Sequence, residues 1–165
     1  MNSPILKLVY ESENRYLTTE ECRSISSYAA SIPSRLAIAS EVEKVETAAV
    51  RDFMDRVQKK YPRVDKFHEQ AREKGERDGA LTVRVITQSM VLNDMSYLDE
   101  RLLFWFRTIQ SSFGFTPTFI RDSYTFLKQS FLERLSMDAA KALTPYFDRV
   151  IEVLSDFPEP ATPRV

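Results

Sequence analysis

The sequence predicts an all-α protein, and three observations carry that prediction. Glycine is scarce, with 3 residues among 165, so tight turns between strands have few places to form. Apolar side chains recur three and four residues apart, which is the spacing of one face of a helix, and the apolar runs are longer than strands usually are. The chain is 43% hydrophobic and long enough for one domain with its own core.

The N-terminal segment predicts a short helix that needs a covering surface. Its apolar residues are Ile5, Leu6, Leu8 and Val9. A single small helix cannot bury such a face by itself. We therefore expect this segment to dock on the body of the protein or on another subunit.

A second helix is expected to begin at Thr18. Thr18 and Glu21 have the spacing of a capping box, in which two side chains bond the free N–H groups of a helix start. An apolar stripe follows at helical spacing, and Pro33 is expected to kink this helix or to end its first half. A further helical segment, 45–61, precedes Pro62.

A third helix is expected from about Asp65 to Met90, and it contains two of the glycines. Gly75 and Gly79 lie four residues apart, although a glycine inside a helix costs roughly 1 kcal/mol relative to alanine. We therefore expect something to approach the backbone closely here, either a neighbouring helix or a flat ligand.

Three more helices are expected after the turn at Asn93-Asp94. Ser96 with Asp99 is expected to cap the first of them, and Gly114 to stop it. Thr116-Pro117 opens the next helix and Ser136 opens the last. Five aromatic side chains are expected to pack in the core: Phe104, Trp105, Phe106, Phe126 and Phe131.

Composition and charge exclude several classes of function. The net charge is -1, with 23 basic and 24 acidic side chains mixed along the chain, so no electrostatic footprint for nucleic acid or an anionic membrane is present. One cysteine, Cys22, and one histidine, His68, can build neither a disulfide nor a metal site. No signal peptide or membrane-spanning stretch is evident, and we expect a soluble, cytoplasmic protein.

Four stretches, in order along nearly the whole chain, resemble the phycobiliproteins, the globin-like light-harvesting subunits of cyanobacteria. They are Arg15-Tyr16-Leu17-Thr18, Ser34-Arg35-Leu36-Ala37-Ile38-Ala39, Arg77-Asp78 followed by Arg84 and Asn93-Asp94, and Tyr146-Phe147-Asp148. The resemblance implies one globin-like helical domain over 1–157, in which 1–17 is the N-terminal helical extension that the family uses for subunit pairing. Residues 158–165 are Pro-rich and are expected to form a disordered tail.

One departure from the family pattern matters most. In the family, a cysteine two residues before the arginine forms a thioether bond to a linear tetrapyrrole, and here that place is Gly75. Covalent attachment at the usual site is therefore excluded. Cys22 is no substitute, because it falls where the family has an ordinary apolar residue. The missing side chain is expected to leave room for a ring at Gly75, in a pocket that is more open or differently covered than in the family.

The resemblance assigns roles to the residues beside Gly75. Asp78 would accept hydrogen bonds from the inner pyrrole N–H groups, and Arg77 would hold a propionate. Phe113 and Phe119 would wall the pigment and exclude water. The competing interpretation is that Arg77 and Asp78 are solvated charges of a surface helix and that the two phenylalanines only pack in the core.

Three functions remain open at this point, and none is enzymatic, because no catalytic constellation or phosphate loop is present. The leading hypothesis is non-covalent binding of a bilin, phycocyanobilin or biliverdin, for carriage, sequestration or sensing in a cyanobacterium-type cell. The second is a pigment-free interaction or assembly protein. The third is a haem sensor that uses His68.

Pairing is expected under the first two hypotheses. A homodimer is the simplest closed solution. The alternatives are a related phycobiliprotein-like subunit, a bilin-synthesis enzyme or a phycobilisome.

Overall fold

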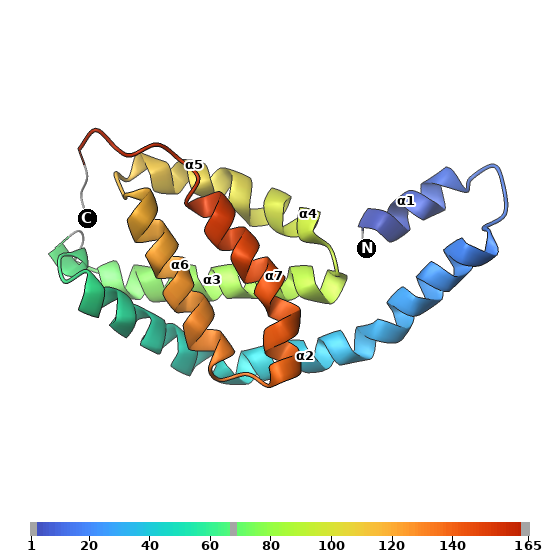
Figure 1. The fold of residues 1–165 in the computed structure, drawn as a ribbon, viewed down its shortest axis with the longest axis horizontal. Helices are drawn as coiled ribbons and strands as arrows, with labels where there is room; N and C mark the ends of the chain where they lie inside the picture. The colour runs from blue at the N-terminus through green and yellow to red at the C-terminus, as the bar shows by residue number, and fades with distance from the viewer. Residues whose placement is uncertain (1–2, 67–68, 163–165) are drawn as a thin grey trace.

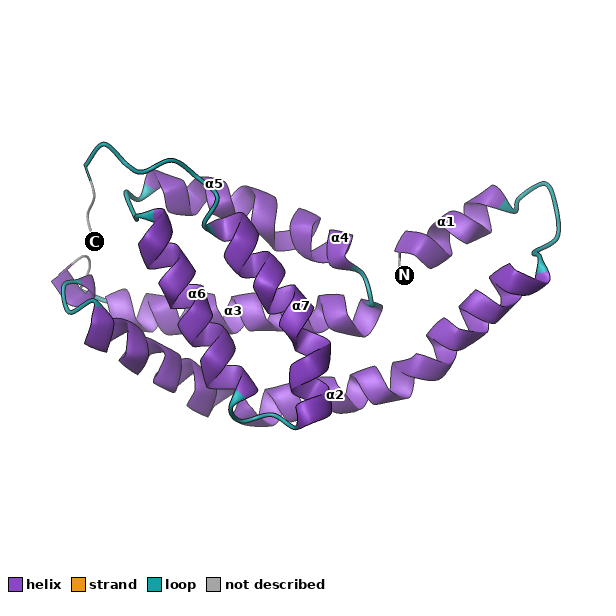
Figure 2. Cartoon of the chain, viewed as in Figure 1, coloured by secondary structure: helices purple, strands orange, loops and turns teal. Residues whose placement is uncertain are grey.

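The computed structural model describes residues 3–66 and 69–162, which fold as a bundle of helices (Figures 1 and 2). The long helices are α1 (Ser3–Glu11), α2 (Thr19–Lys60), α3 (Ala71–Leu92), α5 (Phe104–Ser112), α6 (Pro117–Leu132) and α7 (Met137–Leu154). Shorter pieces are a 3-10 turn (Val64–Lys66), α4 (Met95–Leu98) and a π-helical turn (Asp99–Leu103). No β-strand occurs in those ranges, so the predicted all-α, globin-like fold is confirmed.

The second helix is one continuous rod of 42 residues, where the sequence predicted two segments. The capping box is confirmed: Thr18 Oγ1 accepts from the Glu21 N–H at 3.2 Å, and a Glu21 carboxylate oxygen accepts from the Thr18 N–H at 2.7 Å. Pro33 lies inside α2 without ending it. The helix continues through Pro33 although this residue has no backbone N–H to donate to the preceding turn.

The N-terminal arm, defined as residues 3–34, extends away from the other helices (Figure 1). It consists of α1, the turn after it and the first part of α2. The remaining helices enclose the core. The largest fully buried side chains are Phe131, Phe147, Ile86, Leu98, Leu103, Leu127, Leu143 and Leu154.

Helix α3 crosses α2 at its two glycines. An added Cβ at Gly79 would lie 3.0 Å from a ring carbon of Phe53, and one at Gly75 would lie 2.6 Å from the sulfur of Met54. Phe53 and Met54 are consecutive residues of α2. The close approach that the sequence predicted is therefore an approach to a neighbouring helix.

The turn after α3 differs from the sequence prediction in its cap. Asn93 ends α3 in the left-handed conformation with φ 51°. The side chain of Asp94 then accepts from the Ser96 N–H at 3.1 Å, so Asp94, and not Ser96, caps α4. The single helix expected up to Gly114 is broken into α4, the π-helical turn and α5.

The other predicted caps are confirmed. Gly114 has φ 74° and follows the end of α5. Thr116 caps α6 by accepting from the Phe119 N–H at 3.1 Å, with Pro117 as the first helical residue. Ser136 caps α7 by accepting from the Ala139 N–H at 3.3 Å.

The prediction of core aromatics is right for Phe131, which is fully buried, and wrong for two others. Phe104 is 56% exposed and Trp105 is 50% exposed. The π-helical turn explains the error, because its wider turn rotates the side chains after it to another side of the helix. Leu102 and Leu103 take the buried positions instead. None of the helices in the described ranges is long and apolar enough to cross a bilayer.

Candidate functional site

Arg77 lies on the exposed side of α3, and Asp78 lies at the edge of that side, one turn before the buried Thr82. Arg77 Nε and one terminal nitrogen donate to Asp78 Oδ1 at 3.1 and 3.0 Å. Their side chains are 63% and 39% exposed. In the described structure the two predicted ligand-binding groups therefore satisfy each other at the surface, and they are free to exchange that pair for a ligand.

Gly75 does not have the open space that the sequence led us to expect. Met54 is 3% exposed, and both its sulfur and its terminal methyl carbon lie within 2.8 Å of the position of an added Cβ. The room created by the missing cysteine is filled by this thioether. The expectation of space for a ring directly at Gly75 is wrong, because a residue of α2 distant in the sequence packs there.

The two candidate aromatic residues lie in different environments. Phe119 is 6% exposed, with its ring edge-on to Tyr61 at 5.0 Å and tilted against Phe115 at 5.0 Å. Phe113 is 49% exposed, with its ring 6.0 Å from Phe115. Phe115 thus connects the two. Phe119 is part of the core, whereas Phe113 has a free face.

The aromatic cluster also contains a perturbed hydroxyl. Tyr61 bonds the carboxylate of Asp122, and Lys60 bonds the same carboxylate at 2.6 Å. Burial, with a further contribution from Asp122, raises the pKa of Tyr61 to about 12. The tyrosine is therefore neutral at physiological pH, and this end of the cluster is a structural contact between α2 and α6.

An exposed apolar stripe on α5 was missed by the sequence reasoning. Trp105, Ile109 and Phe113 follow one another at intervals of four residues, and each is at least 39% exposed. On α3, Leu81 is 48% exposed and lies one turn after Arg77. The four-residue spacing was a readable signal, but it is also the spacing of a buried face.

A chain of buried polar groups lies behind Asp78. Thr82 Oγ1 donates to the main-chain oxygen of Asp78 at 2.8 Å, and the Thr82 side chain partly offsets the burial that raises the pKa of Tyr124. Gln110 Nε2 donates to the hydroxyl of Tyr124 at 2.8 Å. Burial raises the pKa of Tyr124, and the charge of Asp78 raises it further. The chain connects α3, α6 and α5 directly beneath the predicted site.

Gln110 ends this chain with an unsatisfied acceptor. The side chain is 7% exposed, and its Oε1 has no hydrogen-bond partner in the described part of the protein. Leaving a buried acceptor unpaired costs about 1–3 kcal/mol.

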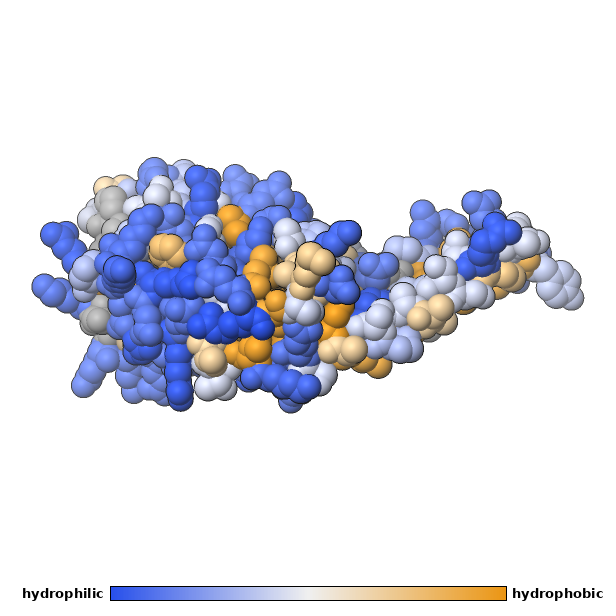
Figure 3. Space-filling view, turned by 60° about the horizontal axis from the view of Figure 1, so that its bottom comes forward, coloured by the Kyte–Doolittle hydropathy of each residue, from blue (hydrophilic) through white to orange (hydrophobic). Residues whose placement is uncertain are grey.

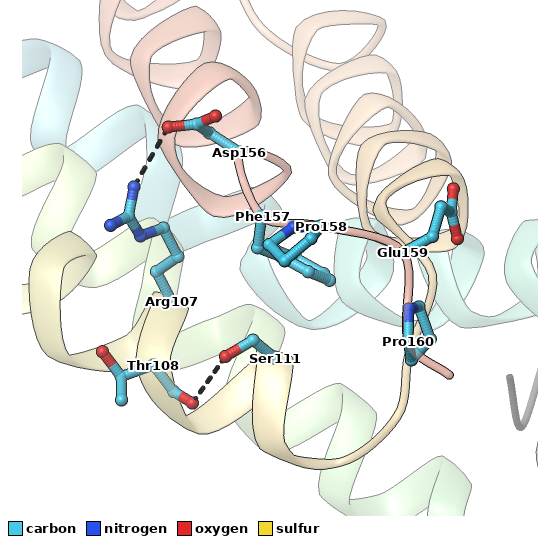
Figure 4. Close-up of a pocket in the computed structure, with 8 residues that line it drawn as sticks. All are labelled: Arg107, Thr108, Ser111, Asp156, Phe157, Pro158, Glu159 and Pro160. Atoms are coloured by element: carbon cyan, nitrogen blue, oxygen red, sulfur yellow. Dashed lines mark hydrogen bonds and ion pairs between the residues drawn. The ribbon is translucent and has the colours of Figure 1, made fainter. Parts of the chain in front are cut away.

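Two hollows lie near α5 and the end of α7. One of about 430 Å³ lies between α5 and the segment after α7, where Arg107 bonds Asp156 at 3.1 Å (Figure 4). A second, of about 580 Å³, shares both residues. Neither of these two hollows is lined by Gly75, Arg77 or Asp78.

The described residues include no group of three side chains able to hold a metal ion. Cys22 is exposed on the N-terminal arm. His68, on which the haem hypothesis depends, lies outside the described residues.

An all-helical globin-like bundle with a helical N-terminal arm, and with an Arg-Asp pair on the first helix after the long rod, defines a phycobiliprotein-like protein. Residues 8–154 match the model of the phycobilisome protein family, and the chain belongs to that family. The resemblance inferred from the four sequence stretches is thereby confirmed.

Three curated relatives show how far the chain has diverged. It is 27% identical over 150 residues to the allophycocyanin alpha-B chain of Porphyra purpurea. It is 26% identical over 152 residues to the allophycocyanin subunit alpha-B of Nostoc sp. and 23% identical over 150 residues to the alpha-B chain of Cyanophora paradoxa. Each alignment covers 88% of this chain and 93% of the relative. The chain is thus a divergent member that aligns with 93% of the length of each of these relatives.

Proposed function

We propose that this chain binds a linear tetrapyrrole, phycocyanobilin or biliverdin, without a covalent bond, for carriage, sequestration or sensing. One observation carries the proposal. The outward face of α3 presents Arg77, Asp78 and the exposed Leu81, while α5 presents the exposed stripe of Trp105, Ile109 and Phe113. Exposed apolar side chains grouped on a single helix mark an interaction site.

The chemistry of these groups suits an open-chain pigment. The Asp78 carboxylate accepts from pyrrole N–H groups, and the Arg77 guanidinium presents a planar fork to a propionate carboxylate. To bind, the two residues exchange their mutual bond for ligand bonds. An exposed ion pair contributes about 0.2–1 kcal/mol, so this exchange costs little. Apolar side chains covered by the pigment gain about 25 cal/mol per Å² of buried surface.

The absence of a thiol at the site makes the binding reversible in this proposal. Gly75 carries no side chain, and the nearest sulfur is the thioether of Met54, which forms no bond to a bilin. Cys22 is on the N-terminal arm, outside α3 and α5. A pigment is therefore held by the Arg-Asp pair and the apolar stripe alone.

The direct test is to mix the purified protein with phycocyanobilin and record the visible spectrum. We expect a red-shifted, sharpened absorption band that acid urea abolishes. Asp78→Asn and Arg77→Ala should weaken the band. Arg84→Ala is the matched control, because Arg84 is an exposed arginine of the same helix that pairs with Glu46 at 2.6 Å. A spectrum identical to that of the free bilin would reject the proposal.

The second candidate is a pigment-free assembly protein, and the N-terminal arm favours it. Four of its apolar side chains stand out into solvent: Val9 (46% exposed), Tyr10 (62%), Tyr16 (98%) and Leu17 (36%). Apolar side chains also gather where the arm leaves the bundle (Figure 3). Leu36, two residues after the arm along α2, is 53% exposed.

We propose that the arm pairs with a second copy or with a related subunit through Ile5, Leu6, Leu8 and Val9. The same pairing is compatible with pigment binding. A protein that pairs through the arm but leaves the bilin spectrum unchanged would support the pigment-free function.

A further inference from the structure

The contact between Met54 and Gly75 differs from the other glycine contact of α3. At Gly79, the nearest atoms to an added Cβ are ring carbons of Phe53 at 3.0 and 3.3 Å and a methyl carbon of Leu127 at 3.5 Å. At Gly75, all the nearest atoms belong to Met54, with the sulfur at 2.6 Å and the methyl carbon at 2.8 Å. The first contact is rigid packing, and the second is the far end of one flexible side chain.

Met54 belongs to the buried core cluster and is 3% exposed at the crossing of α2 and α3. It is not the only contact there, because Phe53 packs against Gly79 at the same crossing. Ion pairs also join the two helices: Arg72 bonds Asp55 at 2.8 Å, and Arg84 bonds Glu46 at 2.6 Å. A smaller side chain at position 54 therefore leaves the other contacts between the helices in place.

We propose that Met54 is a specificity-determining residue that closes the attachment position of the pigment site, so that the site takes a bilin only as a reversible ligand. This inference rests on the proposed bilin function. A thiol at Gly75 alone should attach pigment poorly, because it must first displace the thioether of Met54 from the space into which it extends. Replacing Met54 as well removes this obstacle.

The covalent step used as the readout is an addition. The sulfur of an introduced cysteine forms a bond to the exocyclic ethylidene carbon of phycocyanobilin, while the ethylidene double bond is lost. The thiol hydrogen ends on the adjacent ring carbon. No group leaves and no oxidant or reductant is consumed. The product withstands acid urea, whereas a reversibly bound pigment does not.

The experiment uses four full-length proteins in a Cys22→Ser background, so that each has at most one thiol. The first protein carries no further change, the second carries Gly75→Cys, and the third carries Met54→Ala. The fourth combines Gly75→Cys with Met54→Ala. Each is mixed with phycocyanobilin and then denatured in acid urea. We expect pigment to stay on the chain mainly in the double variant, at least tenfold above Gly75→Cys alone. If Met54→Ala lowers the melting temperature below that of the assay, Met54→Val takes its place.

A measurement without pigment separates the inference from the proposed function. The introduced thiol is titrated with an aromatic disulfide reagent in both backgrounds. We expect Met54→Ala to speed the reaction of the thiol in Gly75→Cys at least tenfold. Gly79→Cys is the matched control: its thiol faces Phe53, so Met54→Ala should leave its rate unchanged.

The outcomes lead to different conclusions. Equal attachment in Gly75→Cys with and without Met54→Ala overturns the role of Met54. So does an absence of attachment in the double variant when the protein with Gly75 and Met54 intact binds the bilin reversibly. If the protein with Gly75 and Met54 intact shows no spectral change with phycocyanobilin, the proposed function itself fails. The thiol titration still tests Met54 in that case, because equal reaction rates of Gly75→Cys with and without Met54→Ala would reject the closure.

Discussion

The bundle buries its apolar side chains, whereas the N-terminal arm leaves several of its own exposed. In the bundle, Phe131, Phe147 and Ile86 are at most 1% exposed, because helices from distant parts of the chain cover them. In the arm, Tyr16 is 98% and Tyr10 is 62% exposed, although the same kinds of residue are present. The bundle covers these side chains within one chain, whereas the arm exposes aromatic side chains of the kind that are enriched in protein interfaces.

The candidate site belongs to the bundle but shares a property with the arm. Leu81, Trp105 and Phe113 are about half exposed; Leu81 lies on α3, whose opposite face is buried, and the other two lie along α5 and at its end. Loss of a side chain from the inner faces should therefore change stability, whereas loss from the arm or the outer faces should change binding. Four predictions test this division, beginning with the largest effect.

The largest effect is expected in the bundle. Phe53→Ala removes the ring against Gly79 and leaves a cavity at the α2–α3 crossing, which should lower the free energy of unfolding by about 3–5 kcal/mol. Urea denaturation followed by circular dichroism measures the loss. Leu81→Ala, on the outer face of α3, is the control and should change stability by less than about 0.5 kcal/mol. Equal losses would show that the two faces of α3 are not distinct.

The next effect is expected in the arm. Leu6→Glu with Val9→Glu places two charges on its apolar face, and we expect the dimer dissociation constant to rise roughly 100-fold, since each tenfold step corresponds to about 1.4 kcal/mol. Sedimentation velocity over a range of concentrations measures the shift. Lys7→Glu, on the same helix with an exposed side chain, is the control. An unchanged oligomeric state would place the pairing surface elsewhere.

A smaller effect is expected on the outer face of the bundle. Asp78→Asn keeps the shape of the side chain but removes the charge that accepts pyrrole N–H groups, so the affinity for phycocyanobilin should fall roughly tenfold. Titration followed by absorption measures it. Stability should hold, because the Arg77–Asp78 pair is exposed. A fall in the melting temperature with unchanged affinity would assign the pair a structural role instead.

The smallest effect concerns the start of α2 in the arm. The hydrogen bond from Arg15, followed by the bonds from Thr18, lowers the pKa of Glu21 to about 2. A carboxyl group with a lowered pKa stabilises the fold fully above its ordinary value of 4.5, and that contribution is lost as the pH falls toward 2. We expect carboxyl chemical shifts to titrate Glu21 in this range, and Arg15→Ala to move the midpoint toward 4.5. A midpoint already near 4.5 in the unchanged protein would contradict the capping box.

Local chemistry made much of the fold predictable. The caps at Thr18, Thr116 and Ser136 depend on residues within three positions, so a single sequence displays them. The close approach at Gly75 and Gly79 was also predictable, because glycine inside a helix needs a reason. The identity of the approaching element was not, because Phe53 and Met54 lie more than twenty residues away in the sequence.

The errors arose where tertiary structure overrides local pattern. Residues 19–60 form one helix, with Pro33 inside it, where two segments were predicted, and Phe104 and Trp105 are exposed because a π-helical turn precedes them. The predicted cap of α4 was Ser96, and the observed cap is Asp94, two residues earlier in the same turn. The expected space at Gly75 was wrong for the same reason, since the absence of a side chain does not say which neighbour fills the gap.

The unbroken helix α2 has a mechanical consequence. At about 1.5 Å per residue, its 42 residues form a shaft of roughly 60 Å that begins in the arm and carries Met54 in its second half. Tilting the free end is therefore transmitted to the contact between Met54 and Gly75 through one continuous helix, in which Pro33 is a weaker point because it donates no backbone hydrogen bond. A partner bound to the arm would act in this way on the crossing of α2 and α3.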